Sequence, residues 1–222
     1  MNLLTDKINI FYFKYLYAAF GSAMIVSIYS VIDMAIVGQY QGPSGTAALA
    51  VVAPIWNIIY SLGLLMGIGG SVIFSILRGK MENNTRTSNE FFSTAIIGSI
   101  ILSILTWITL SLAVPNWYIR LFMNPTEHIL QIAPAIIRTY SISFLLLPLN
   151  IFATYYFQAI VRLKAAFIVS VLRGLVISSI LLLVLPSSFG GYSIWITMPI
   201  TELIVAIIAI FCMIKYTPKI NT

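Results

Sequence analysis

The sequence predicts an all-α, polytopic membrane protein with six transmembrane helices. This prediction rests on the amino-acid composition and on the pattern of apolar runs. Of the 222 residues, 60% are apolar and only 8% are charged, and the mean hydropathy is +1.00. A soluble domain carries about 25% charged residues, and disorder needs low hydrophobicity and high charge. Long apolar stretches alternate with short polar or turn-rich segments, and about 20 helical residues cross a hydrocarbon core of roughly 30 Å.

Each long apolar stretch is interpreted as one helix. The expected helices lie, in order, near residues 11–37, 47–77, 92–114, 133–158, 165–186 and 192–214. The first run is too long for a signal-peptide core and no small-residue cleavage pattern follows it, so we expect a retained helix. The segments between the helices are too short to hold a soluble domain, so residues 1–222 are expected to form a single six-helix bundle.

The basic residues predict the orientation of the helices. The net charge is +6. If the six helices alternate in direction, nine basic residues fall on one side, namely Lys7, Lys14, Arg78, Lys80, Arg86, Arg162, Lys164, Lys215 and Lys219. The other side carries only Arg120 and Arg138. Cytoplasmic loops carry an excess of Lys and Arg, so we expect a multi-pass protein of the cell (plasma) membrane with both termini in the cytoplasm.

The sequence contains no motif that indicates catalysis or metal binding. Cys212 is the only cysteine and His128 the only histidine, so one chain cannot hold a disulfide framework or a Cys/His metal cluster. No Ser/His pair, His-Glu-x-x-His or paired-Asp motif is present, and a nucleophile needs a matched base. We expect neither an enzyme nor a bound cofactor, and the net positive charge is attributed to membrane orientation, not to nucleic acid.

Asp33 stands near the far end of the first apolar run, and a carboxylate at membrane depth is costly unless it is paired, protonated or hydrated. Tyr29 lies four residues before it, and Ser27 and Ser30 share its helix face. Similar polar stripes follow the second and fourth helices, with Asn57 on the second and Asn150, Thr154 and Gln158 on the fourth. Such stripes face other helices or water, and either interhelical hydrogen bonding or a translocation path explains them.

Two further charges fall inside the membrane, Arg173 in the fifth helix and Glu202 in the sixth. If the turn between these helices is centred near Phe189, the two residues differ in depth by only about 4–5 Å. We therefore expect a structural ion pair, with a role of Glu202 in ion coupling as the alternative. Gly63 and Gly67 have the small-xxx-small spacing of close helix packing, and Pro54, Pro148 and Pro199 are positioned to kink their helices.

Several segments together resemble the multidrug and toxic compound extrusion (MATE) transporters, and the bacterial multidrug-efflux branch is the most similar. In the first two helices these segments are 29–38 (YSVIDMAIVG), 45–50 (GTAALA), Pro54 and 63–71 (GLLMGIGGS). In the second half they are 156–160 (YFQAI), 170–173 (SVLR), 185–186 (LP), 189–190 (FG), 194–195 (IW) and 198–202 (MPITE), which resemble the family's last three helices. Members have about twelve helices in two six-helix lobes, so this chain is half-size and resembles the first helices of one lobe joined to the last helices of the other.

The resemblance implies a secondary active transporter that exports amphipathic organic compounds or drugs in exchange for protons or sodium. In that picture Asp33 and Glu202 are the ion-coupling residues, and Tyr29, Asn57, Asn150, Thr154 and Gln158 line the substrate cavity. A homodimer or a second half-transporter would complete the two lobes, because the lobes are parallel repeats. The alternatives are a truncated, non-transporting protein or assembly subunit, and a lipid-linked sugar flippase, whose cavity would need more Arg and Lys at membrane depth.

Overall fold

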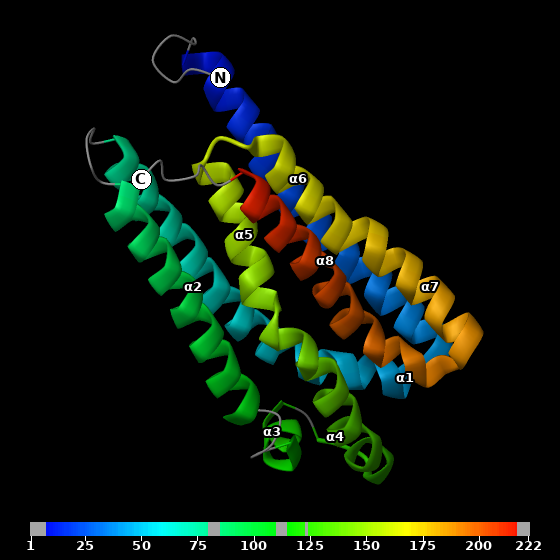
Figure 1. The fold of residues 1–222 in the computed structure, drawn as a ribbon. Helices are drawn as coiled ribbons and strands as arrows, with labels where there is room; N and C mark the ends of the chain where they lie inside the picture. Colours follow the sequence, from blue (N-terminus) through cyan, green and yellow to red (C-terminus); the bar gives the residue numbers. More distant parts are fainter. Residues whose placement is uncertain (1–7, 80–84, 110–114, 123, 217–222) are drawn as a thin grey trace.

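The computed structural model describes residues 8–79, 85–109, 115–122 and 124–216, and these residues form an entirely helical bundle (Figure 1). The major helices are α1 (Ile8–Gly79), α2 (Thr85–Ile108), α3 (Pro115–Phe122), α4 (Glu127–Ser141), α5 (Leu147–Ala159), α6 (Leu163–Val171), α7 (Ile177–Phe189) and α8 (Ile194–Tyr216). Short segments join some of them, namely the 3-10 turns η2 (Ile142–Leu145) and η4 (Gly191–Ser193) and the π-helical η3 (Leu172–Val176).

Helix α1 consists of two arms that meet at Gly42. This residue has φ 62° and ψ −159°, a backbone conformation that glycine adopts without the strain a Cβ would cause. Pro43 follows, and its missing N–H and fixed φ suit the first turn of the second arm. The predicted break at Gly42-Pro43 is therefore confirmed, but the helices continue much closer to it than the boundaries 37 and 47 imply.

The other predicted helices are found with shifted ends. The predicted helix 92–114 corresponds to α2, which begins at Thr85 and ends at Ile108, and residues 110–114 lie outside the described part. The predicted helix 133–158 corresponds to the helical segment 127–159, within which the 3-10 turn η2 separates α4 from α5 just before Pro148, the residue predicted to kink it. The predicted helices 165–186 and 192–214 correspond to 163–189 and 191–216.

Four described helical segments are long and apolar enough to cross a membrane, at 12–77, 127–159, 163–189 and 191–216. The first contains both arms of α1, and α2 adds a shorter apolar stretch, Ser93–Ile108. Six crossings therefore remain a prediction. Helix α1 begins and α8 ends at the same end of the bundle, where the α5–α6 turn also lies, and α3 and α4 lie at the opposite end (Figure 1).

This arrangement separates the basic residues as the charge pattern predicts. Lys14, Arg162, Lys164 and Lys215 belong to elements at the end where α1 begins, and Arg120 and Arg138 belong to α3 and α4. Lys7, Lys80 and Lys219, which the orientation argument also used, lie outside the described residues. Which end faces the cytoplasm stays a prediction.

The packing centres on α5, which contacts the second arm of α1 and also α8 (Figure 1). A Cβ on Gly63 would lie 2.9 Å from Ile151 Cδ1 and 3.3 Å from the Pro148 Cα, so this glycine lets the two backbones approach. A Cβ on Gly67 would lie 3.4 Å from the Phe152 Cα. The prediction that Gly63 and Gly67 serve close helix packing is confirmed.

Candidate functional site

Asp33 lies in a wedge between the two arms of α1. Its side chain is only 7% exposed, and it borders a cavity of about 420 Å³. The cavity is lined by the first arm from Val26 to Met34, by Leu49, Val52, Ala53 and Trp56 of the second arm, and by Tyr140 of α4. The fold-back at Gly42 thus creates this cavity, because it brings the second arm across the face that carries Asp33.

Tyr29 and Tyr140 connect Asp33 to the interior of the bundle. Tyr29 stands one helical turn before Asp33, and its hydroxyl lies beside both the Asp33 carboxyl group and Tyr140. Both tyrosines are also within electrostatic range of Glu202 on α8. Within the described residues, the Tyr29 hydroxyl is buried without a hydrogen bond of good geometry.

Glu202 is fully buried and is held by Asn150 of α5. The Asn150 Nδ2 donates to Glu202 Oε2 at 2.5 Å and to the Glu202 backbone carbonyl at 2.9 Å. The remaining oxygens of the two side chains, Glu202 Oε1 and Asn150 Oδ1, are buried and accept no hydrogen bond from any described residue. Buried polar atoms are nearly always paired, and each of these oxygens could accept a proton donor or contribute an oxygen ligand to a small cation.

Arg173 does not form the predicted ion pair with Glu202. Across the described residues no nitrogen of Arg173 lies within 4 Å of a carboxylate oxygen, and its Nη1 is buried without a hydrogen-bond acceptor. The two charges nevertheless interact through space. Matching depth was not sufficient, because the rotation of each helix about its axis also decides which side chains meet, and η3 alters that rotation at Arg173.

The Arg173 side chain instead borders a second cavity of about 100 Å³ on the first arm of α1. Thr154, Tyr155 and Gln158 of α5 line the same cavity, so two of the predicted cavity residues meet the arginine here. A neighbouring groove of about 520 Å³ contains Tyr15, Tyr155 and Gln158, and the Tyr15 hydroxyl donates to the Gln158 carbonyl at 2.8 Å.

Asn57 is the predicted cavity residue that stands apart. Its side chain is exposed on the second arm of α1 and borders none of the cavities described above. Ser61, one turn later, is exposed on the same face, and its hydroxyl donates to the Asn57 carbonyl at 2.8 Å. An amide exposed at membrane depth needs a polar neighbour from outside the described residues or water.

The sequence argument missed Tyr140 and Trp56. Ser143 lies seven residues before Asn150, on the polar stripe of the predicted fourth helix, and Tyr140 lies three residues before Ser143, so extending that stripe by one turn would have indicated it. Trp56 stacks on Tyr60 at 4.8 Å between ring centroids and lies where the Asp33 cavity approaches the Arg173 cavity. Across the described residues no group of three or more His, Cys, Asp or Glu side chains could hold a metal ion.

A family model described as MatE matches residues 18–184, which is more than half of the chain. Two solved structures align with 86% of this chain at 18% identity and a TM-score of 0.78. One is a MOP superfamily transporter from Pyrococcus furiosus whose binding pocket is described as having reverse polarity, and the other is an outward-facing multidrug resistance MATE family transporter. The alignments cover 42% of each of those chains, so this chain spans less than half their length. No curated protein matches it.

Proposed function

The chain belongs to the MatE family of membrane transporters, and on that premise we propose that it is one lobe of a cation-coupled antiporter. Protons or sodium would enter the cell in exchange for amphipathic organic compounds or drugs that leave it. The observation that carries this proposal is that Glu202 Oε1 and Asn150 Oδ1 are buried and accept no hydrogen bond from any described residue, while Tyr29 and Tyr140 interact electrostatically with both Glu202 and Asp33.

Coupling follows from the electrostatics of this path. Asp33 and Glu202 are both buried, and charges interact more strongly where the dielectric constant is low. A proton or sodium ion at Glu202 would make the electrostatic potential around Tyr29, Tyr140 and Asp33 less negative. Asp33 would then bind a cationic substrate less tightly. Binding of the substrate at Asp33 would lower the affinity for the coupling ion by the same factor, because linkage between two sites is reciprocal. Such competition is what antiport requires.

The cavity at Asp33 fits an organic cation. It combines one carboxyl group with the aromatic rings of Tyr29, Trp56 and Tyr140, and aromatic faces attract cations. Of the described residues, no Lys or Arg lines it. A lipid-linked sugar flippase would need the opposite polarity for an anionic headgroup, and Arg173 lines a different cavity. The charge of the lining therefore favours efflux of cationic compounds over the flippase alternative.

A second lobe would complete the substrate path. The chain spans 42% of the matched transporters, and the exposed Asn57–Ser61 face together with the cavity at Gln158 and Arg173 is unsuited to lipid. We therefore propose that this face lines a central cavity shared with a second copy of the chain or with another half-transporter. Native mass measurement in mild detergent tests this, since a strict monomer without transport would favour the non-transporting alternative.

Efflux of a fluorescent organic cation from membrane vesicles tests the coupling proposal. We expect Asp33→Asn and Glu202→Gln each to abolish efflux driven by a proton or sodium gradient, with unchanged folded yield. Glu127→Gln, which neutralises an exposed carboxylate at the start of α4, is the matched control and should transport normally. Full ion-driven efflux by the Asp33→Asn variant would refute the role of Asp33, and efflux of Glu202→Gln with unchanged ion dependence would refute the role of Glu202.

A further inference from the structure

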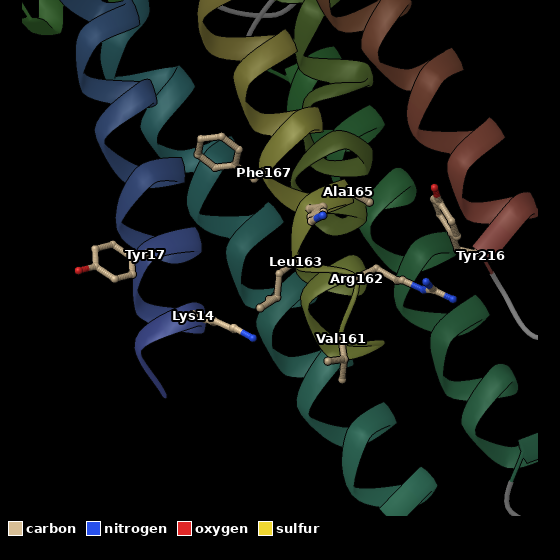
Figure 2. Close-up of a pocket in the computed structure, with 9 residues that line it drawn as sticks. Lys14, Tyr17, Val161, Arg162, Leu163, Ala165, Phe167 and Tyr216 are labelled. Carbon is tan, nitrogen blue, oxygen red and sulfur yellow. The ribbon is translucent and has the colours of Figure 1, made fainter. Parts of the chain in front are cut away.

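A basic pocket lies at the end of the bundle where α1 begins, away from Asp33 and Glu202. It has a volume of about 730 Å³ and is formed by α1, the turn between α5 and α6, the start of α6, and the end of α8 (Figure 2). Lys14, Arg162 and Lys164 line it, and among the described residues no Asp or Glu does. Three cations around one cavity, with no carboxylate from the described part of the chain, create a positive potential that the proposed transport mechanism does not use.

The helix packing holds these cations around one space. A Cβ on Gly21 would lie 2.8 Å from the ring of Phe167, so this glycine lets α6 pack closely on α1. Lys14 is two turns before Gly21 and shares its face, and Figure 2 shows its side chain reaching from α1 toward Leu163. Arg162 extends to the other side, where its guanidinium lies 5.1 Å from the centre of the Tyr216 ring.

Further features of the pocket add positive potential. Lys215 Nζ lies 5.7 Å from the centre of the same Tyr216 ring. Helix α6 begins at Leu163 without a side-chain cap, so its first N–H groups contribute a partial positive charge beside Lys164. The ligand expected here is therefore an anion.

The same pocket has apolar and aromatic walls. Tyr17 is 73% exposed and Phe167 is 39% exposed, and both border the pocket beside the lysines. Aromatic and basic side chains that meet at the end of a transmembrane helix are typical of the membrane–water interface. A small soluble anion would use only the cations, whereas a phospholipid would use the cations with its headgroup and the aromatic rings with its glycerol and upper acyl chains.

We propose that this pocket binds the phosphate of an anionic phospholipid from the leaflet at this end of the bundle. Basic pockets between transmembrane helices bind such headgroups, and each Lys or Arg near an anionic surface contributes about a fivefold gain in affinity. The predicted orientation places the pocket in the cytoplasmic leaflet, where anionic lipids are enriched. The pocket is separate from the coupling path, so the proposal does not depend on the direction or substrate of transport.

Lipid titration of the delipidated chain, followed by native mass spectrometry, tests this proposal. We expect phosphatidylglycerol to bind at least tenfold more tightly than phosphatidylcholine. The Lys14→Gln/Lys164→Gln double variant should bind phosphatidylglycerol about 25-fold more weakly, from about fivefold for each lysine, with phosphatidylcholine binding unchanged. Arg162 is left in place because its contact with Tyr216 supports the packing of α6 and α8.

Two further variants make the result decisive. Arg120→Gln/Arg138→Gln removes two exposed positive charges from the other end of the bundle and should leave lipid binding unchanged. Lys14→Arg/Lys164→Arg keeps the charge and should retain phosphatidylglycerol, which separates loss of charge from loss of fold. Equal affinity for the two lipids, or equal loss in both Gln double variants, would overturn the proposal. Complete competition by millimolar inorganic phosphate would overturn the lipid assignment in favour of free phosphate.

Discussion

The bond between Asn150 and Glu202 gives the sharpest prediction about this fold. Asn150→Ala removes both the 2.5 Å bond to the Glu202 carboxyl group and the 2.9 Å bond to its backbone carbonyl. Neutral hydrogen bonds between membrane helices average about 0.6 kcal/mol, and charge-assisted bonds are about twice as strong. With the cost of leaving a buried acceptor unpaired, we expect Asn150→Ala to lower the free energy of unfolding by about 2–3 kcal/mol.

A double-mutant cycle with Glu202→Ala isolates the bond between the two side chains. The backbone carbonyl of residue 202 survives in Glu202→Ala, so its bond to Asn150 does not enter the coupling energy. We expect a coupling of about 1–2 kcal/mol, measured by unfolding in mixed micelles. Trp107→Phe with Ser141→Ala is the reference cycle, because Trp107 Nε1 donates to the neutral Ser141 hydroxyl at 3.0 Å. That cycle should give about 0.6 kcal/mol.

The outcome of the two cycles decides whether Asn150 and Glu202 form a unit. If the free energies of Asn150→Ala and Glu202→Ala add to within about 0.3 kcal/mol, the two side chains are independent and the reasoning is refuted. A coupling no larger than that of the Trp107–Ser141 pair would show that the bond gains nothing from charge. It would then weaken the case that Glu202 is poised to take up a cation.

Two further predictions concern glycine and the backbone. Gly63→Ala should lower the free energy of unfolding by about 1–3 kcal/mol, because its Cβ meets the Pro148 backbone. Gly69→Ala, whose Cβ would have nothing within 4 Å, should be neutral or stabilising by up to about 1 kcal/mol. Equal effects of the two substitutions would refute the packing argument. Val161→Gly should stabilise the protein by about 1 kcal/mol, or roughly 2–4 °C, because Val161 lies just after the C-cap of α5 with φ 61°, where glycine is unstrained. Ala165→Gly, in a regular helix, should destabilise instead, and a loss of stability in Val161→Gly would refute the strain.

The apolar runs predicted where the helices lie, and the turn residues predicted where they break. Neither predicted the 3-10 geometry before Pro148. Gly42-Pro43 marked the fold-back of α1 because few residues other than glycine adopt φ 62°. Pro148 suggested a kink in the fourth helix, and the structure has the 3-10 turn η2 just before it, within one membrane-spanning segment. Apolar composition does not distinguish a kinked helix from two joined helices, since both bury the same side chains.

In the candidate site, contacts between residues on one helix could be predicted from the sequence, whereas contacts between different helices could not. The spacing of Tyr29 and Asp33 on one helix fixed their common face, and both border the same cavity. The partner of Glu202 depended on how three helices turn toward one another, and Asn150 took the position expected for Arg173. The depth of a residue in the membrane follows from counting residues along its helix. The rotation of that helix about its axis depends on packing against the other helices, so the sequence of one helix does not determine it.

The polar residues of this chain therefore divide between two environments with different requirements. Asp33, Tyr29, Glu202 and Asn150 are buried among helices of the same chain, so a single copy already contains every group of the proposed coupling path. Asn57 is exposed to its surroundings and has no such enclosure. A single copy should therefore bind the coupling ion even where it cannot enclose a substrate, and ion binding without transport by a monomer would be the direct consequence of this division.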